Sequence, residues 1–144
     1  QVSSEWSGLR AVAMRLLQEE SELQEIVRLV GIDALSIADR MILETTKSIR
    51  EDYLHQNAFH DVDTYASLDK QYRMLKLILT FHTEAMKAIE AGAEFRKIID
   101  LPVREQIARA KYIPEEQIDE ISTIEKVIKE QLEALVAEGG TISA

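Results

Sequence analysis

The fold class follows from residues 9–31, which read LRAVAMRLLQEESELQEIVRLVG. Apolar residues recur there every three or four positions, the spacing that places side chains on one face of an α-helix. They are Leu9, Val12, Leu16, Leu23, Ile26, Val27 and Val30. Charged residues such as Arg15 and Glu19 fall outside this stripe, and Gly31 stands where a left-handed glycine would end the helix. We therefore predict a long amphipathic helix over residues 5–30.

Helical spacing continues along most of the remaining chain, and no alternating pattern typical of strands competes with it. Ser36 can cap a second helix, because a serine side chain accepts hydrogen bonds from the first free N–H groups of a helix. We expect this helix to fade near Gln56-Asn57. A third long helix is predicted from Ser67 to Gly92, where a second glycine would end it.

The last third of the chain predicts two short helices and one longer one. The short helices are expected over residues 94–99 and 103–110. Pro114 stands at a favoured first-turn position of the final helix, which we expect to end at Gly139-Gly140. The predicted fold is thus all-α, a helical bundle with three long helices and several shorter ones.

Composition indicates one domain and excludes several classes of partner. The length of 144 residues suits a single helical domain, which we place at residues 1–138, with a frayed tail at 139–144. Its 26 acidic and 17 basic residues give a net charge of −9, which disfavours binding to nucleic acid or anionic lipid.

The absence of cysteine excludes disulfides and thiolate zinc sites, and favours a cytoplasmic setting. No apolar run approaches the roughly 18 residues of a membrane span, so direct membrane insertion is not expected. Because the chain begins without methionine, we interpret it as a fragment of a larger subunit.

Catalytic and metal-binding motifs are not evident. No Gly-x-x-x-x-Gly-Lys-Ser/Thr loop is present to hold phosphates, so the chain alone is not predicted to hydrolyse nucleotides. The three histidines, His55, His60 and His82, could be grouped with Asp61 and Asp63 as metal ligands, but their spacing matches no compact motif. We expect no metal site, and interpret the histidines as surface or hydrogen-bonded residues.

The stretch from Asn57 to Ala66 loses the helical period and is typical of an irregular loop, a common place for functional residues. Within it Phe59, Val62 and Tyr65 recur every three residues among polar neighbours. Such side chains could present apolar faces to a flat ligand such as a base. The spacing alone leaves core packing open as the alternative.

Four stretches carry a resemblance to a known family. Residues 49–65 read IREDYLHQNAFHDVDTY, and residues 70–76 continue with KQYRMLK. Residues 16–31 and 101–105 also fit. Together they resemble the C-terminal helical domain of the catalytic A subunit (alpha chain) of archaeal-type A/V-type ATP synthases, which are rotary ATPases.

This resemblance implies a domain that couples ATP synthesis or hydrolysis to rotor rotation and ion transport. In the family, three catalytic subunits alternate with three B subunits around a central shaft, in a hetero-hexamer peripheral to the membrane. A separate domain holds the phosphates of ATP or ADP and the Mg²⁺ ion, so no cofactor is expected for this chain alone. The turn between the first two helices leans on the shaft. Carried over by position, the rotor contact comprises Asp33, Ala34, Leu35, Ser36, Ile37, Ala38 and Asp39.

The resemblance also assigns the irregular loop to the adenine side of the nucleotide site. Phe59 would face the adenine ring, Val62 would line its edge and Tyr65 would close the pocket. Two departures stand out. Ile37 and Ala38 replace the proline and acid that are usual in the turn, which favours steric contact by Leu35 and Ile37 over contact by charge, and Ala66 replaces a common cysteine. Folding back of both turn residues as a staple between the helices is the alternative.

Two other classes of protein compete with this interpretation. A free-standing helical adaptor would bind partner helices through an apolar groove. A carboxylate metalloprotein would need Glu-x-x-His pairs, and the sequence has none.

Overall fold

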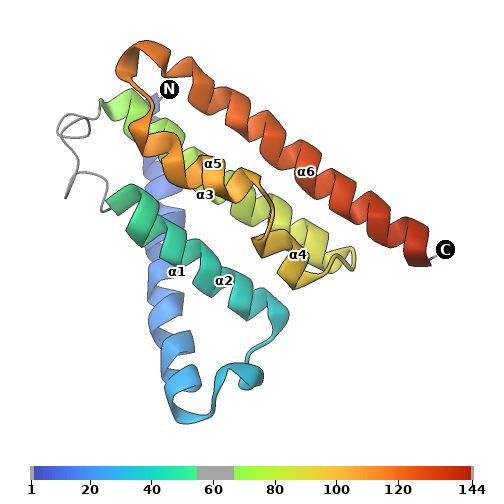
Figure 1. Cartoon of the computed structure of the whole chain (residues 1–144). Helices are drawn as coiled ribbons and strands as arrows, with labels where there is room; N and C mark the ends of the chain where they lie inside the picture. Colours follow the sequence, from blue (N-terminus) through green and yellow to red (C-terminus); the bar gives the residue numbers. More distant parts are fainter. Residues whose placement is uncertain (1, 55–66, 144) are drawn as a thin grey trace.

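The computed structural model describes residues 2–54 and 67–143, and this part of the chain is helical throughout apart from short connections (Figure 1). No strand occurs among these residues, which confirms the predicted all-α class. The α-helices and short helical turns, in chain order, are α1 (Val2–Leu29), η1 (Ile32–Ala34), α2 (Ile37–Ser48), η2 (Ile49–Leu54), α3 (Leu68–Glu90), α4 (Phe95–Ile99), α5 (Val103–Arg109), η4 (Ala110–Tyr112), η5 (Glu115–Gln117) and α6 (Asp119–Ser143).

The starts of α2 and α3 are fixed by the serines that the sequence indicates. The Ser36 Oγ accepts a hydrogen bond from the Asp39 N–H at 3.1 Å, and the Ser67 Oγ accepts one from the Lys70 N–H at 3.0 Å. Both serines have extended backbone, which lets each side chain reach the free N–H groups of the first turn. The predicted Ser36 cap is confirmed, and Ser67, predicted only as the start of the third helix, caps α3 in the same way.

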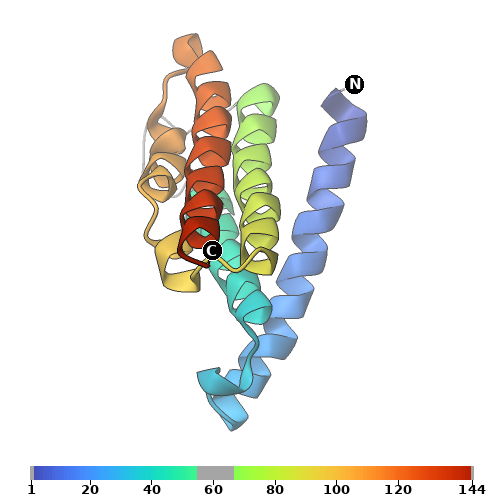
Figure 2. The ribbon, with the colours of Figure 1, turned by 90° about the vertical axis from the view of Figure 1, so that its right-hand side faces the viewer.

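Helix α3 forms the centre of the molecule. It contacts α1 and α2 on one side and α6 on the other, while α5 contacts α3, α6 and η2. Figure 2 shows α3 between α1 and α6, with α1 at the edge of the bundle. The largest fully buried apolar side chains of the core come from α2, η2 and α3 to α6, and include Met41, Ile49, Leu75, Leu77, Ile98, Val103, Ile121, Ile128 and Leu132.

Three features differ from the sequence-based expectation. The backbone of Pro114 is extended, so η5 precedes α6, and α6 begins at Asp119. At the end of α2 the chain continues as a π-helical turn, η2, before residue 55. Helix α6 does not end at Gly139-Gly140 but runs to Ser143. Gly139 does not adopt the positive φ that Gly31 and Gly92 adopt, so nothing in its backbone ends the helix. The predicted fraying of residues 139–144 concerns motion and stays a prediction.

Candidate functional site

The α1–η1–α2 hairpin projects beyond the other helices, as both ribbon views show (Figures 1 and 2). Helix α1 has 28 residues, which corresponds to about 42 Å at 1.5 Å per residue. Gly31 follows it with a φ of 112°, a left-handed conformation that reverses the chain into η1. The 12-residue α2 then returns toward the bundle. A long helical hairpin therefore presents a short turn at its far end.

Five large apolar side chains are exposed at this end and form what we call the apolar tip: Ile26, Leu29, Val30, Ile32 and Ile37, at 39, 67, 73, 44 and 40% exposure. Ile26 and Val30 belong to the apolar stripe predicted for this helix, yet both are exposed. Their stripe continues to the end of α1, but α2 begins only at residue 37 and the remaining helices do not reach this far. Leu29 and Ile32 were not predicted as site residues. The density of apolar residues on both sides of Gly31, wider than one helix face, is the signal that could have identified them.

The residues predicted to contact a rotor divide into exposed and buried groups. Asp33, Ala34, Ser36 and Ile37 are exposed, and Ala38 and Asp39 are half-buried. Leu35 is only 5% exposed, so the expectation that it sits outward at the tip was wrong. Leu35 is thus buried, as the staple alternative had it for both residues, whereas Ile37, the first residue of α2, is exposed.

The charges around the apolar tip are paired with one another. The Asp33 carboxylate lies 3.6 Å from the Arg40 guanidinium, and Glu25 forms an ion pair with Arg28 one turn earlier on α1. Asp39 lies in the first turn of α2, where the helix dipole favours an acid. Both cations therefore have acidic partners, and two ion pairs border the apolar tip.

The predicted adenine-binding residues, Phe59, Val62 and Tyr65, lie outside the described residues. So do His55, His60, Asp61, Asp63 and Ala66. The described residues that flank this stretch are η2 on one side and Ser67 with the start of α3 on the other.

The remaining histidine, His82, is hydrogen-bonded, one of the two roles that we expected for the histidines. Its Nδ1 lies 2.6 Å from the Thr45 Oγ1, which joins α3 to α2. Burial lowers the pKa of His82, and the positive charge of Arg15 lowers it further. Within residues 2–54 and 67–143, no three histidine, aspartate or glutamate side chains gather as a metal site would require.

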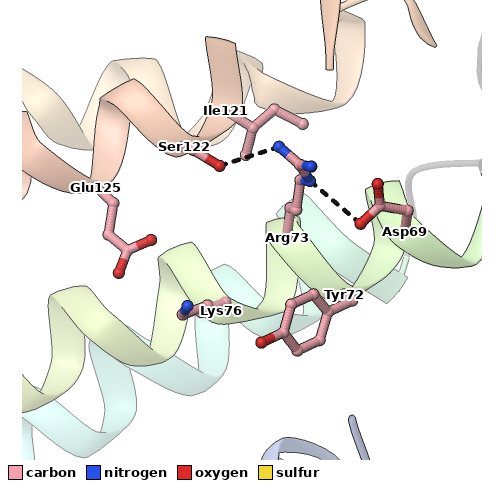
Figure 3. A pocket seen from close by; sticks show the side chains of 7 residues that line it. All are labelled: Asp69, Tyr72, Arg73, Lys76, Ile121, Ser122 and Glu125. Carbon is pink, nitrogen blue, oxygen red and sulfur yellow. Dashed lines mark hydrogen bonds and ion pairs between the residues drawn. The ribbon is translucent and has the colours of Figure 1, made fainter. Parts of the chain in front are cut away.

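A groove of about 260 Å³ lies between α3 and α6 and is lined by Asp69, Tyr72, Arg73, Lys76, Ile121, Ser122 and Glu125 (Figure 3). Figure 3 shows the Arg73 guanidinium between Asp69 and Ser122. It donates hydrogen bonds to the Asp69 carboxylate at 3.1 Å, to Asp119 and Ser122 at 3.0 Å each, and to the Ile118 carbonyl at 3.4 Å. These acids neutralise Arg73, so the groove is not suited to hold phosphate groups.

No helix in the described part of the chain is long and apolar enough to cross a membrane.

Relatives of known name match almost the whole chain. It is 62% identical to the "V-type ATP synthase alpha chain" of Acetivibrio thermocellus over 94% of this chain and 23% of the relative. Identity is also 62% to the alpha chain of Thermoanaerobacter pseudethanolicus and 58% to that of Clostridium botulinum, each over 99% of this chain and 24% of the relative. The chain thus spans about a quarter of the length of these relatives. They come from bacteria, so an archaeal source stays a prediction.

The family described as the C-terminal domain of V and A type ATP synthase matches residues 1–99, which hold α1, the apolar tip, α2, α3 and α4. This range covers more than half of the chain, and the relatives extend the similarity through α6. The chain belongs to the family of C-terminal domains of V- and A-type ATP synthases.

Proposed function

We propose that this chain is the moving end of the catalytic A subunit of a rotary ATP synthase, and that its apolar tip leans on the central shaft. Rotation of the shaft would then displace the tip, and the rigid hairpin would pass that displacement to the nucleotide site. In this role the domain couples ATP synthesis or hydrolysis to rotation and ion transport. Its partners are the shaft and the neighbouring B subunits of a hetero-hexamer, on the cytoplasmic side and peripheral to the membrane.

One observation carries the proposal: the five exposed side chains of the apolar tip gather at the far end of the α1–η1–α2 hairpin. Val30 and Leu29 are 73% and 67% exposed, more than any other large apolar side chain in the described residues except Leu68. A contiguous exposed apolar patch is typical of a protein interface. Its place at the end of a stiff lever suits a contact that transmits force, since a small rotation at the base becomes a large displacement at the tip.

The adenine contacts belong to the same proposal and rest on the family. Phe59, Val62 and Tyr65 would line the adenine side, while the rest of the subunit holds the phosphates of ATP or ADP and the Mg²⁺ ion. The chain alone contains no phosphate loop, so we expect it to hydrolyse no ATP. A phosphate-release assay on the purified chain should stay at background, and magnesium-dependent turnover would contradict this part.

Cross-linking tests the contact directly, because the chain has no cysteine of its own. A single Val30→Cys substitution in the assembled ATPase, treated with a short thiol-reactive cross-linker, should join this chain to the shaft and stop rotation. Met14→Cys is the matched control, since Met14 is also on α1 and 58% exposed but lies about 24 Å from residue 30 along the helix. Cross-linking to the shaft by both variants, or by neither, would contradict the proposal.

The free-standing adaptor has one structural feature in its favour. A shallow groove of about 400 Å³ lies between the end of α3 and α6, with Ala88, Leu132 and Val136 among its lining residues. Its apolar lining would suit a partner helix. The 57–62% identity to alpha chains over nearly the whole chain favours the subunit instead.

A further inference from the structure

The chain on each side of residues 55–66 is held by one and the same segment. We define the loop stems as residues 51–54, at the end of η2, and residues 67–70, at the start of α3. The η4–η5 segment, residues 110–117, makes polar contacts with both stems. It is far from them in sequence and lies beyond residues 1–99, the range that the family description matches. These contacts are therefore not part of that family match.

The first contact uses Lys111. Its Nζ donates a hydrogen bond to the Glu51 carbonyl at 3.2 Å. The last carbonyls of a helical run lack an N–H partner within the helix, and Glu51 lies in the final turn of η2. Next to it, burial raises the pKa of the Asp52 carboxyl, and the positive charge of Lys111 acts in the opposite direction. Lys111 thus gives the Glu51 carbonyl a hydrogen-bond donor, and its positive charge offsets part of the free-energy cost of burying the Asp52 carboxylate.

The second stem is held by two contacts. The Lys70 side chain is 2% exposed, and its Nζ donates to the Lys111 carbonyl at 2.9 Å, at the end of η4. The Ser67 N–H donates to the Glu115 Oε2 at 3.2 Å, so the first free N–H of the second stem also has an acceptor. Side chains therefore bond to backbone groups in both directions: those of the η4–η5 segment bond to the end of η2 and the start of α3, and the Lys70 side chain bonds to η4.

We propose that Lys111 and Glu115 are positioning residues that fix the spacing of the two loop stems. This spacing sets where the chain leaves η2 and where it enters α3. The consequence for nucleotides rests on the proposed function, which places adenine against Phe59. The mechanical part rests only on the described contacts. Loss of Lys111 or Glu115 should loosen the stems and weaken base recognition while leaving the distant chemistry of phosphate transfer intact.

The experiment uses the assembled ATPase with two matched pairs of variants. Lys111→Met keeps the aliphatic part of the side chain and removes the charge. Its control is Lys47→Met, at an exposed lysine of α2. Glu115→Ala is paired with Glu116→Ala, the exposed neighbour on η5. Lys111→Arg keeps a donor at the same place and should retain the parent behaviour. Because Glu115 is exposed, its replacement is expected to leave the core intact even if Lys111→Met impairs folding.

Two readouts are measured on each variant. Hydrogen–deuterium exchange without nucleotide should be faster in peptides covering residues 49–54 for Lys111→Met and residues 67–72 for Glu115→Ala, by about three- to tenfold over the controls. The KM for ATP should rise by about three- to tenfold with kcat nearly unchanged, and the preference for ATP over GTP should fall. We call the contacts of Lys111 and Glu115 with the two loop stems the clamp. Exchange equal to that of the controls would show that these contacts do not hold the stems and would overturn the proposal. If exchange rises but Phe59→Ala and the clamp variants all leave the KM for ATP unchanged, the clamp stands and the adenine assignment fails.

Discussion

Leu35 and Ile37 are neighbours in the turn but have different environments. Leu35 is 5% exposed and Ile37 is 40% exposed. A buried leucine contributes to folding whether or not a partner is present, whereas an exposed isoleucine has little to lose when the domain stands alone. Substitution of Leu35 is therefore expected to affect the stability of the domain, whereas substitution of Ile37 is expected to affect contact with a partner.

Replacing each residue by alanine tests this separation. Leu35→Ala should lower the free energy of unfolding of the isolated domain by about 2–4 kcal/mol, because it leaves a cavity inside the hairpin. Ile37→Ala should change it by less than about 1 kcal/mol. Urea unfolding followed by circular dichroism measures both values. Equal losses for the two variants would show that the turn is packed differently.

His82 makes a prediction about pH. Burial lowers its pKa below the ordinary value of 6.5, so below pH 6.5 the unfolded chain binds a proton that the folded chain does not. The contribution to stability is then complete above pH 6.5 and is lost as the pH falls toward the lower pKa of the folded state. His82→Gln can still bond to Thr45 but does not titrate. Between pH 7.5 and 5.5 its urea midpoint should fall less than that of the parent chain, and an equal fall would contradict the assignment.

At the scale of the element, the ends of helices depend on backbone conformation as much as on residue type. Gly31 and Gly92 have φ values of 112° and 98°, and each follows the end of a helix. Gly139 lies within α6 and does not adopt a positive φ. The same residue type therefore ends two helices and continues a third, which is why the sequence predicted the ends of α1 and α3 but not that of α6.

Alanine substitutions at two of these glycines should change the stability of the domain in opposite directions. An added Cβ would meet no atom within 4 Å at either Gly92 or Gly139, so only the backbone distinguishes the two positions. Gly92→Ala should destabilise the domain by about 1 kcal/mol or more, because alanine disfavours positive φ. Gly139→Ala should stabilise α6 by up to about 1 kcal/mol. Thermal unfolding of the two variants measures the difference, and shifts of the same sign would refute the conformations described.

Other element boundaries show what local patterns can and cannot predict. The Ser36 cap and the start of α3 near Ser67 were predictable, because a capping serine acts on N–H groups within its own helix turn. The π-helical turn of η2 was not, because its residues continue the helical spacing of α2 and the wider turn is stabilised by tertiary contacts such as that of Lys111. The contacts of Glu115 with the distant Ser67 likewise require the folded chain.

At the scale of the whole molecule, the sequence predicts well which face of a helix is apolar, but it predicts poorly how far along the helix its neighbours cover that face. The stripe of α1 includes both Leu16, which is buried in the core, and Val30, which is exposed at the end that no other described helix reaches. Helical periodicity tells which side of a helix is apolar but not where its neighbours end. The apolar tip is a property of this arrangement, whereas the family itself could be identified from continuous stretches such as residues 49–65.

The central claim is that the apolar tip transmits force between the shaft and the nucleotide site. In the assembled enzyme, replacing Leu29 and Val30 together by serine removes the two most exposed apolar side chains of the tip, and Met14→Ser is the control on the same helix. The measurement is the number of ions transported per ATP hydrolysed in sealed vesicles. We expect the double variant to keep its KM for ATP and to transport several-fold fewer ions per ATP, with Met14→Ser unchanged. An unaltered ratio in the double variant would contradict the account.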